Sequence, residues 1–205
     1  GPLGVSLSEG VHTLGGRAFR VMLPEATPAP VLLVLHGGGG AGGRAMNGAR
    51  SNSGLAASHS LIGPDGPSRS WNIKAEPSNE DDVTYIGVRL VEHLSGFDNV
   101  EPIFKCMGFS NGAALVNRIL IENDDSRLTH AVTISSQLNT LQFHDQRFYI
   151  GGPSNTYTTT KPTLTPRRLL QIVGGLDTVV PAAGGASVIP NGEGGTLSFV
   201  PWEQS

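Results

Sequence analysis

The feature of the sequence that most restricts its fold is a serine flanked by glycines, placed between a strand and a helix. Residues 108–112 read GFSNG, follow the apolar run 103–107 and precede the helix-like stretch 113–122. A sharp strand-to-helix turn of this kind holds a serine out of the sheet and leaves no room for side chains beside it. Since a serine hydroxyl needs exposure, a base and oxyanion donors to become a nucleophile, the pattern predicts that Ser110 is catalytic. An ordinary glycine-rich loop is the alternative.

A second glycine-rich segment, residues 36–40 (HGGGG), follows the continuous apolar run 31–35. It matches the oxyanion loop of lipases and esterases, in which glycine lets the backbone approach a substrate carbonyl and point an N–H group at it. We therefore predict that the backbone N–H groups of Gly38 and Asn111 form the oxyanion hole. His36 precedes the nucleophile and belongs to the loop motif, so we expect it to fix the loop rather than to act as the base.

Strand-like and helix-like segments alternate along the chain, which predicts an α/β fold with a mostly parallel sheet and helices on both faces. No linker divides the chain, and 205 residues suffice for one core, so we predict a single domain over residues 5–205. Residues 1–4 (GPLG) resemble the remnant of a cleaved tag. Residues 137–168 are rich in Thr, Pro and Gly, which is typical of a lid or covering loop. The expected strands lie at 17–23, 31–35, 61–65, 103–107, 131–134 and 169–173, and the expected helices at 45–59, 80–94 and 113–122.

Charge and hydropathy exclude two classes of partner. The formal net charge is −3 and no cluster of Lys and Arg is present, whereas a nucleic-acid surface needs grouped positive charge. No apolar stretch approaches the roughly 20 residues that a membrane span requires. We therefore expect neither nucleic acid nor membrane as a partner. The single cysteine, Cys106, cannot form an intrachain disulfide and leaves the localisation undetermined.

The glycine run also fits a different class of protein, a Rossmann-like dinucleotide-binding protein. Gly38, Gly40 and Gly43 satisfy the G-x-G-x-x-G pattern after a strand, and Asp65 lies 22 residues beyond Gly43 at the end of the next strand. So dense a glycine run satisfies this pattern in more than one register. The dinucleotide interpretation also leaves the serine turn unexplained, so we keep it as the alternative.

The acid that would orient a catalytic base is predicted to be Asp177. In this class of enzyme the chain order is nucleophile, acid, histidine, and Asp177 follows the apolar run 169–173 after a short glycine turn. That position places it at the carboxyl edge of the sheet, where Ser110 is also expected. Asp145 lacks a clear preceding strand and is the weaker candidate.

Taken together, these motifs resemble one known family. Residues 35–40 (LHGGGG), 64–66 (PDG) with 70–72 (SWN), 81–83 (DDV), 108–112 (GFSNG), and Asp177 with 180–181 (VP) and 184–185 (GG) follow in the order of polyhydroxybutyrate depolymerase and feruloyl esterase-like α/β-hydrolases. The resemblance implies hydrolysis of small, aryl or polyester-type carboxylic esters through an acyl-serine, without metal or organic cofactor. It also implies that Trp71 and His36 lie at the substrate-binding pocket, although a tryptophan of the core is an equally good interpretation of Trp71. The resemblance favours a secreted or periplasmic enzyme.

The sequence departs from this family in its histidines. All six, at positions 12, 36, 59, 93, 130 and 144, precede Asp177, whereas the family places its base after the acid. We therefore expect an α/β-hydrolase fold that lacks its C-terminal portion, with the base carried by a further segment or a separate polypeptide. Two alternatives remain open: His144 folds over the sheet edge as the base, or the chain is a non-catalytic, hydrolase-like binding protein.

Overall fold

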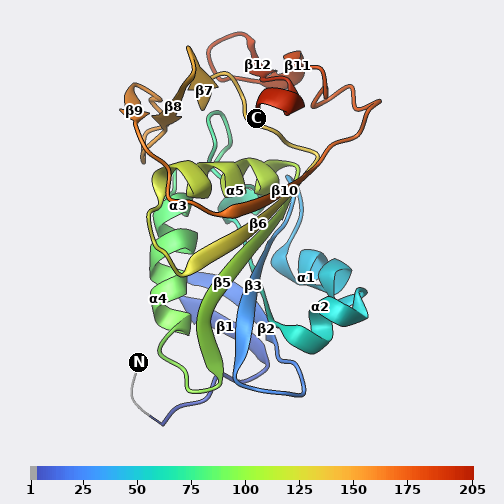
Figure 1. Cartoon of the computed structure of the whole chain (residues 1–205), viewed down its shortest axis with the longest axis vertical. Coiled ribbons are helices and arrows are strands. Elements are labelled where there is room, and N and C mark those ends of the chain that lie inside the picture. Colours follow the sequence, from blue (N-terminus) through green and yellow to red (C-terminus); the bar gives the residue numbers. More distant parts are fainter. Residues whose placement is uncertain (1–3) are drawn as a thin grey trace.

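The computed structural model describes residues 4–205, so most of the expected tag remnant lies outside the described residues. Its centre is a seven-stranded sheet of order β1-β2-β4-β3-β5-β6-β10 (Figure 1). β4, β3, β5, β6 and β10 run parallel, while β1 and β2 are antiparallel to their neighbours. The predicted, mostly parallel sheet is confirmed. The strands are β1 (Gly10–Leu14), β2 (Arg17–Met22), β3 (Ala29–Leu35), β4 (Ser60–Pro64), β5 (Val100–Phe109), β6 (Leu128–Ile134) and β10 (Arg168–Ile172).

Helices cover both faces of this sheet, as predicted. One face packs against α3 (Asp82–Thr84), η2 (Tyr85–Leu90), α4 (Val91–Leu94) and α5 (Asn111–Glu122). The other packs against α1 (Gly42–Arg50) and α2 (Ser53–Ser58). The continuous run Val31 to Leu35 is buried along its whole length because its side chains enter these two cores alternately.

Two of the expected helices differ in detail from the sequence prediction. The stretch 45–59 forms two helices, because Asn52 interrupts it and its side chain accepts hydrogen bonds from the N–H groups of Gly54 and Leu55, which begins α2. The stretch 80–94 is helical from Asp82 to Leu94 but contains a π-helical segment, η2.

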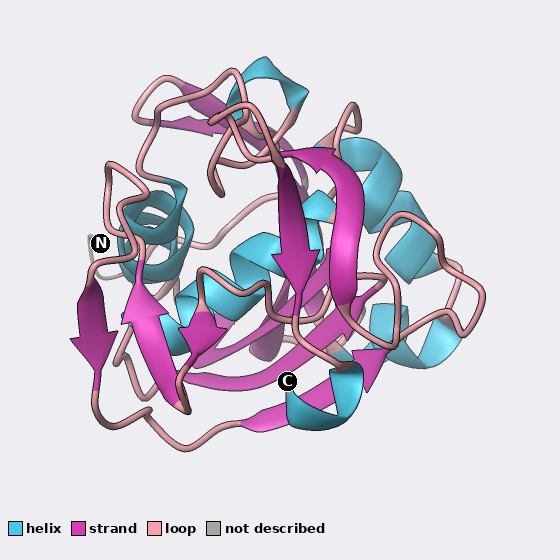
Figure 2. Ribbon diagram, turned by 90° about the horizontal axis from the view of Figure 1, so that it is seen from above, coloured by secondary structure: helices cyan, strands magenta, loops and turns pink. Residues whose placement is uncertain are grey.

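Two small antiparallel sheets lie above the carboxyl ends of the parallel strands (Figures 1 and 2). One consists of β7 (Phe143–His144), β8 (Arg147–Ile150) and β9 (Thr159–Lys161). The other is the hairpin of β11 (Gly185–Pro190) and β12 (Thr196–Phe199), which crosses above α5 and is followed by the short helix η3 (Trp202–Gln204). A further short helix, η1 (Pro67–Arg69), follows β4.

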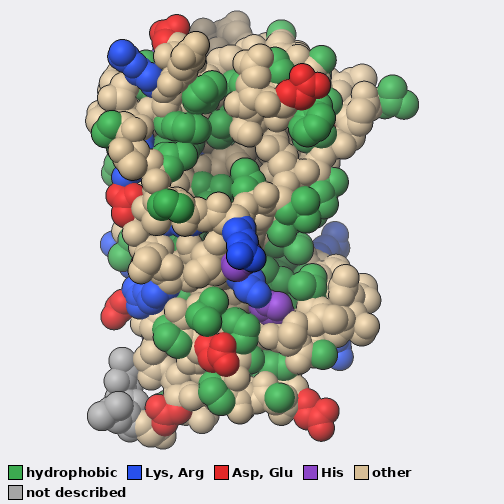
Figure 3. Space-filling view, viewed as in Figure 1, with side chains coloured by type: hydrophobic (Ala, Val, Ile, Leu, Met, Phe, Trp, Pro, Cys, Tyr) green, Lys and Arg blue, Asp and Glu red, His purple; other side chains and the backbone are tan. Residues whose placement is uncertain are grey.

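The face of β5, β6 and β10 beside α1 and α2 is only partly covered. Phe109, Leu170 and Ile172 are exposed on it. Lys105, His130 and Arg168 are paired in register across the three strands and form a basic row on the same face. Figure 3 shows hydrophobic side chains beside Lys, Arg and His side chains over this part of the sheet. β10 has a strand neighbour on one side only within residues 4–205.

A search of residues 4–205 for helices with the length and hydropathy of a membrane span finds none.

Candidate active site

Ser110 lies on a strained turn between β5 and α5. Its backbone has φ 51° and ψ −119°, a conformation that side-chain-bearing residues rarely adopt. Neighbouring backbone atoms leave no space for a Cβ at either flanking glycine. A Cβ at Gly108 would lie 2.3 Å from the carbonyl oxygen of Gly112, and one at Gly112 would lie 2.5 Å from the carbonyl oxygens of Leu35 and His36. The turn thus brings Ser110 against the end of β3.

The loop after β3 lies directly beside this turn. A Cβ at Gly37 would be 3.5 Å from that of Ser110, and one at Gly38 would be 3.8 Å from that of Asn111. Gly39, at φ 74°, donates its N–H to the carbonyl of Arg69 and so holds the loop in place. Within residues 4–205 the N–H groups of Gly38 and Asn111 donate to no other backbone or side-chain group. The structure therefore brings the two expected oxyanion donors together beside Ser110 with their N–H groups free.

A cavity of about 230 Å³ opens at Ser110, Gly38 and Asn111. This is the carboxyl end of β3 and β5, the neighbouring strands at which the order of the parallel strands reverses, where α/β sheets bind ligands. The cavity is covered by an apolar set of residues that we call the roof: Val180, Ile189, Leu197 and Phe199. Of the expected covering segment 137–168, only Asn139 lines the cavity. The roof comes instead from the loop after β10 and from the β11–β12 hairpin.

The structure corrects the expectation that His36 and Trp71 lie at the substrate-binding pocket. Both side chains are almost fully buried, and neither lines the cavity. The His36 ring accepts from the N–H of Gly66 through Nε2 (2.9 Å) and contacts the Gly37 carbonyl through Nδ1 (2.8 Å). The indole of Trp71 donates to the carbonyl of His36 (2.8 Å) and packs against its ring. Both residues contact the loop of residues 36–40 from the side away from the cavity, and His36 thereby holds this loop to Gly66.

Asp177 follows β10 at the same edge of the sheet as Ser110. Its carboxylate accepts hydrogen bonds from the N–H groups of Val179 and Val180, at 2.8 and 2.9 Å, and Val180 lines the cavity. In this structure Asp177 therefore shapes the turn that leads into the roof. Its side chain does not itself line the cavity.

None of the six histidines lines the cavity in residues 4–205. His144 lies in β7, where its ring stacks on Tyr149 and its Nδ1 contacts the carbonyl of Thr140 at 2.9 Å. Both ring nitrogens of His36 are engaged in hydrogen-bond contacts with the backbone of Gly37 and Gly66. Burial lowers the pKa of His36 below its ordinary value, so this ring is neutral at physiological pH.

Glu76 is the one charged residue among those that line the cavity within residues 4–205, and the sequence motifs did not indicate it. Its Oε2 accepts from the N–H groups of Ile73 and Lys74, both at 2.8 Å, and of Ala75, at 3.1 Å. Its Oε1 accepts from the side-chain amide of Asn111 at 3.0 Å. Glu76 stands in an irregular loop, and neither periodicity nor a motif marks it; only its closeness to the 70–72 motif could have drawn attention to it.

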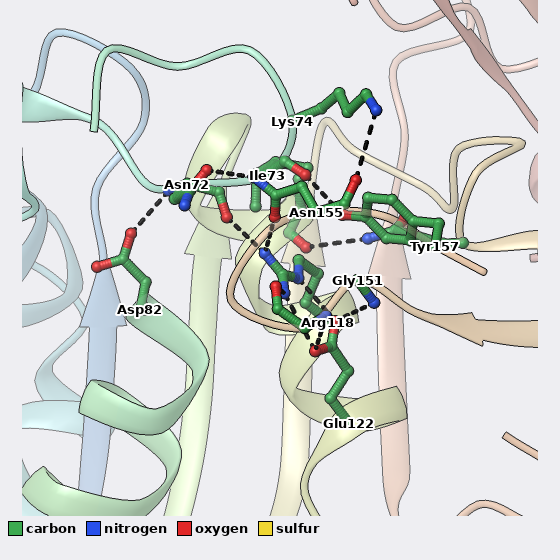
Figure 4. Close-up of polar contacts among 12 residues, drawn as sticks. Asn72, Ile73, Lys74, Asp82, Arg118, Glu122, Gly151, Asn155 and Tyr157 are labelled. Atoms are coloured by element: carbon green, nitrogen blue, oxygen red, sulfur yellow. Dashed lines mark hydrogen bonds and ion pairs between the residues drawn. The ribbon is translucent and has the colours of Figure 1, made fainter. Parts of the chain in front are cut away.

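A buried polar network holds this loop and the 137–168 segment to α5 (Figure 4). Arg118 pairs with Glu122 at 2.7 Å and donates to the carbonyl of Asn72 (2.7 Å), the side chain of Asn155 (2.6 Å) and the carbonyl of Gly152 (2.9 Å). The hydroxyl of Tyr157 donates to the carbonyl of Ile73 at 2.6 Å. Because Ile73 also lines the cavity, the network fixes one cavity wall from behind.

Asp65, the acidic residue on which the dinucleotide alternative depends, has a structural role. The Asp65 carboxylate accepts from the N–H of Gly42 at 2.7 Å, at the start of α1, and pairs with Arg20 at 2.9 Å. Gly42 itself permits close packing, since a Cβ there would lie 2.2 Å from the carbonyl oxygen of Gly63. As for metal sites, residues 4–205 contain no group of three or more His, Cys, Asp or Glu side chains placed to hold an ion.

No protein-family model and no curated protein sequence matches the chain. Among solved structures, the complex of a pOPH variant with DMSO aligns with 100% of this chain and 75% of its own, at 14% identity and a TM-score of 0.56. Native pOPH (18% identity, TM-score 0.45) aligns over 65% of this chain, and a Bacillus cereus carboxylesterase (23%, 0.43) over 59%. The chain spans only 55% of native pOPH and 60% of the carboxylesterase.

The full-length alignment, the strand order and the strained serine turn agree on one architecture. Sequence identities this low are evidence of fold alone, and the narrower resemblance to polyhydroxybutyrate depolymerases and feruloyl esterases stays a prediction. The chain has the α/β-hydrolase fold.

Proposed function

We propose that this chain carries the nucleophile and the oxyanion hole of a carboxylic-ester hydrolase that works through an acyl-serine intermediate. The observation that supports this most is the strained backbone of Ser110, which faces a cavity beside two unpaired N–H groups. Strain of this size, about 1–3 kcal/mol, persists where the surrounding structure enforces it, and such sites are commonly functional.

The proposed reaction has two steps. Ser110 Oγ attacks the ester carbonyl carbon, its proton passes to a base, and the bond to the alcohol oxygen breaks as the base returns the proton to the leaving alcohol. Water then attacks the acyl-serine and releases the acid. The N–H groups of Gly38 and Asn111 stabilise the oxyanion in both steps; removing one such donor typically costs about 10²–10³ in rate. Asp177 is proposed to orient the base.

We propose that the base is a histidine on a further segment, either fused to this chain or a separate polypeptide. Two features support this: no histidine of residues 4–205 reaches the cavity, and β10, which leads into the Asp177 loop, has a free outer edge. A mobile β7 hairpin that swings His144 to Ser110 is the internal alternative. The lack of a histidine at the cavity also supports a second function, a non-catalytic protein that binds small molecules in the hydrolase cavity.

As substrates we propose small, aryl or polyester-type esters, the classes that the family resemblance implies. The cavity is small compared with drug-sized ligand sites of about 300–1,000 Å³, and the roof that covers it is apolar. Both properties suit a short acyl or alcohol group. The resemblance likewise favours a secreted or periplasmic enzyme that needs no cofactor.

A fluorophosphonate, which adds covalently to activated serines, tests the nucleophile. We expect labelling of the chain extended by its following native segment, loss of labelling in Ser110→Ala, and retention in Ser136→Ala, a matched control that removes another cavity serine. Labelling that survives Ser110→Ala would refute the assignment. If the extended chain is never labelled yet binds small esters, the non-catalytic function replaces the proposed one.

Hydrolysis of short p-nitrophenyl esters by the 205-residue chain and by the extended chain tests the base. We expect the extension to raise turnover by several orders of magnitude, because it returns the general base to a site whose oxyanion donors are in place. Strong activity of the short chain that disappears in His144→Ala would show instead that the base is internal.

A further inference from the structure

The cavity at Ser110 contains a single charged side chain, Glu76, among the residues that line it within positions 4–205. Four N–H donors hold its carboxylate in place: three from the backbone of Ile73, Lys74 and Ala75 on Oε2, and one from Asn111 on Oε1. An acid this firmly positioned cannot turn away from the cavity without giving up these bonds. The negative charge is therefore a fixed part of the wall.

Within residues 4–205 Glu76 forms no ion pair with a Lys, Arg or His side chain. Lys74, two residues earlier in the sequence, pairs with Glu193 at 2.8 Å and contacts the carbonyl of Asn155. No Lys, Arg or His lines the cavity within residues 4–205. Oε1 accepts one hydrogen bond, although a carboxylate oxygen can accept two. A ligand in the cavity thus meets an unneutralised charge with spare hydrogen-bonding capacity.

The rest of the wall increases the effect of this charge. Ile73 and Pro77 flank Glu76, and the roof is apolar. Charges interact more strongly beside low-dielectric surfaces than in open water. A carboxylate of a ligand placed here would be repelled and partly desolvated at the same time, whereas an ammonium or a hydroxyl group would gain a partner.

We propose that Glu76 determines specificity, by selecting ligands that carry an ammonium or hydroxyl group close to the reacting ester and by excluding those with a carboxylate. As a statement about substrates this rests on the proposed esterase function. As a statement about the cavity it does not, because the charge would select ligands even without catalysis.

Binding to the Ser110→Ala protein tests the proposal without chemistry. The probes are pentylamine, 1-pentanol and pentanoate at neutral pH, which share a chain length and differ in the end group, and affinity is measured by NMR titration. We expect pentylamine to bind at least about tenfold more tightly than pentanoate, with the alcohol between them, and the ratio to shrink as salt screens the charge. Equal affinities, or tighter binding of pentanoate, would overturn the proposal.

Two substitutions in the same background assign the effect to one residue. Glu76→Gln should bring the amine-to-pentanoate ratio close to one, while Glu80→Gln, a matched change of an exposed carboxylate nearby, should leave it unchanged. A ratio that persists in folded Glu76→Gln would refute the role of Glu76. If that variant does not fold, the salt-sensitive ratio of the Ser110→Ala protein itself decides.

The fluorophosphonate experiment separates the two proposals. If the Ser110→Ala protein prefers pentylamine but the fluorophosphonate never labels the extended chain, the esterase function is refuted and the selection by charge stands. Labelling without charge selectivity would refute only the role of Glu76.

Discussion

Adding one methyl group at Gly112 should destabilise the whole protein, although the residue lies in a helix. The new Cβ would lie 2.5 Å from the carbonyl oxygens of Leu35 and His36. Both contacts are backbone atoms at the end of β3, so relief requires α5 to move away from the sheet. Overpacking of this kind costs about 1–3 kcal/mol, and more when backbone must shift, against a gain of at most about 1 kcal/mol in helix propensity. We expect Gly112→Ala to lose roughly 2 kcal/mol.

Gly48→Ala is the matched control. Gly48 also lies in a helix, but a Cβ there would meet no atom within 4 Å, so the same substitution should stabilise by about 0.5–1 kcal/mol. Urea unfolding of the two variants beside the parent chain measures the difference, and a melting temperature lower by about 4–8 °C is expected for Gly112→Ala. If Gly112→Ala is as stable as Gly48→Ala, the close approach of α5 to β3 is not real and the argument for the serine turn fails with it.

Three further predictions concern strain, pH and the buried network. Ser110→Gly should be more stable than Ser110→Ala by about 1 kcal/mol, because glycine adopts the observed φ without strain; equal unfolding midpoints would contradict that strain. Because burial lowers the pKa of His36, the unfolded chain takes up its proton first, so stability should fall as the pH drops below 6.5; the loss between pH 7.5 and 5.5 should be smaller in His36→Gln, and identical losses would argue against this. Arg118→Met should cost about 3–5 kcal/mol by leaving Glu122 buried and unpaired, and adding Glu122→Gln should restore part of it; no recovery in the double variant would show that the pair is not the cause.

The central sheet could be predicted because short apolar runs in the sequence indicate its parallel strands. The run Val31 to Leu35 is apolar without interruption, and burial on both faces requires that composition. The short strands above the sheet were not predicted. β12 is bridged by Phe199 to Asn139, 60 residues earlier, and such distant partners leave no periodic pattern in the sequence. β1 was also not predicted; it is exposed along most of its length, and within residues 4–205 it pairs with β2 alone.

In the candidate site, features set by contacts between neighbouring residues in the sequence could be predicted, and features set by distant residues could not. The closeness of Gly38 and Asn111 depends on glycines whose steric need is local, so motif and spacing indicated it. The burial of Trp71 and the place of Glu76 depend on contacts with His36 and Asn111, each 35 residues away, and no rule of spacing reports them. Whether Asp177 orients a base stays a prediction.

Within residues 4–205 the outer edge of β10 has no strand partner, and this edge affects how the chain behaves in concentrated solution. A strand with unpaired N–H and C=O groups is a template for another strand, and Leu169, Leu170 and Ile172 on it are exposed. Such an edge favours intermolecular sheet extension and aggregation unless charge opposes it. Arg168 lies at the start of this strand and opposes such pairing, because a charged side chain on an edge strand disfavours the addition of a second apolar strand. Solubility of this chain therefore depends in part on the positive charge of Arg168 beside the exposed apolar side chains of β10.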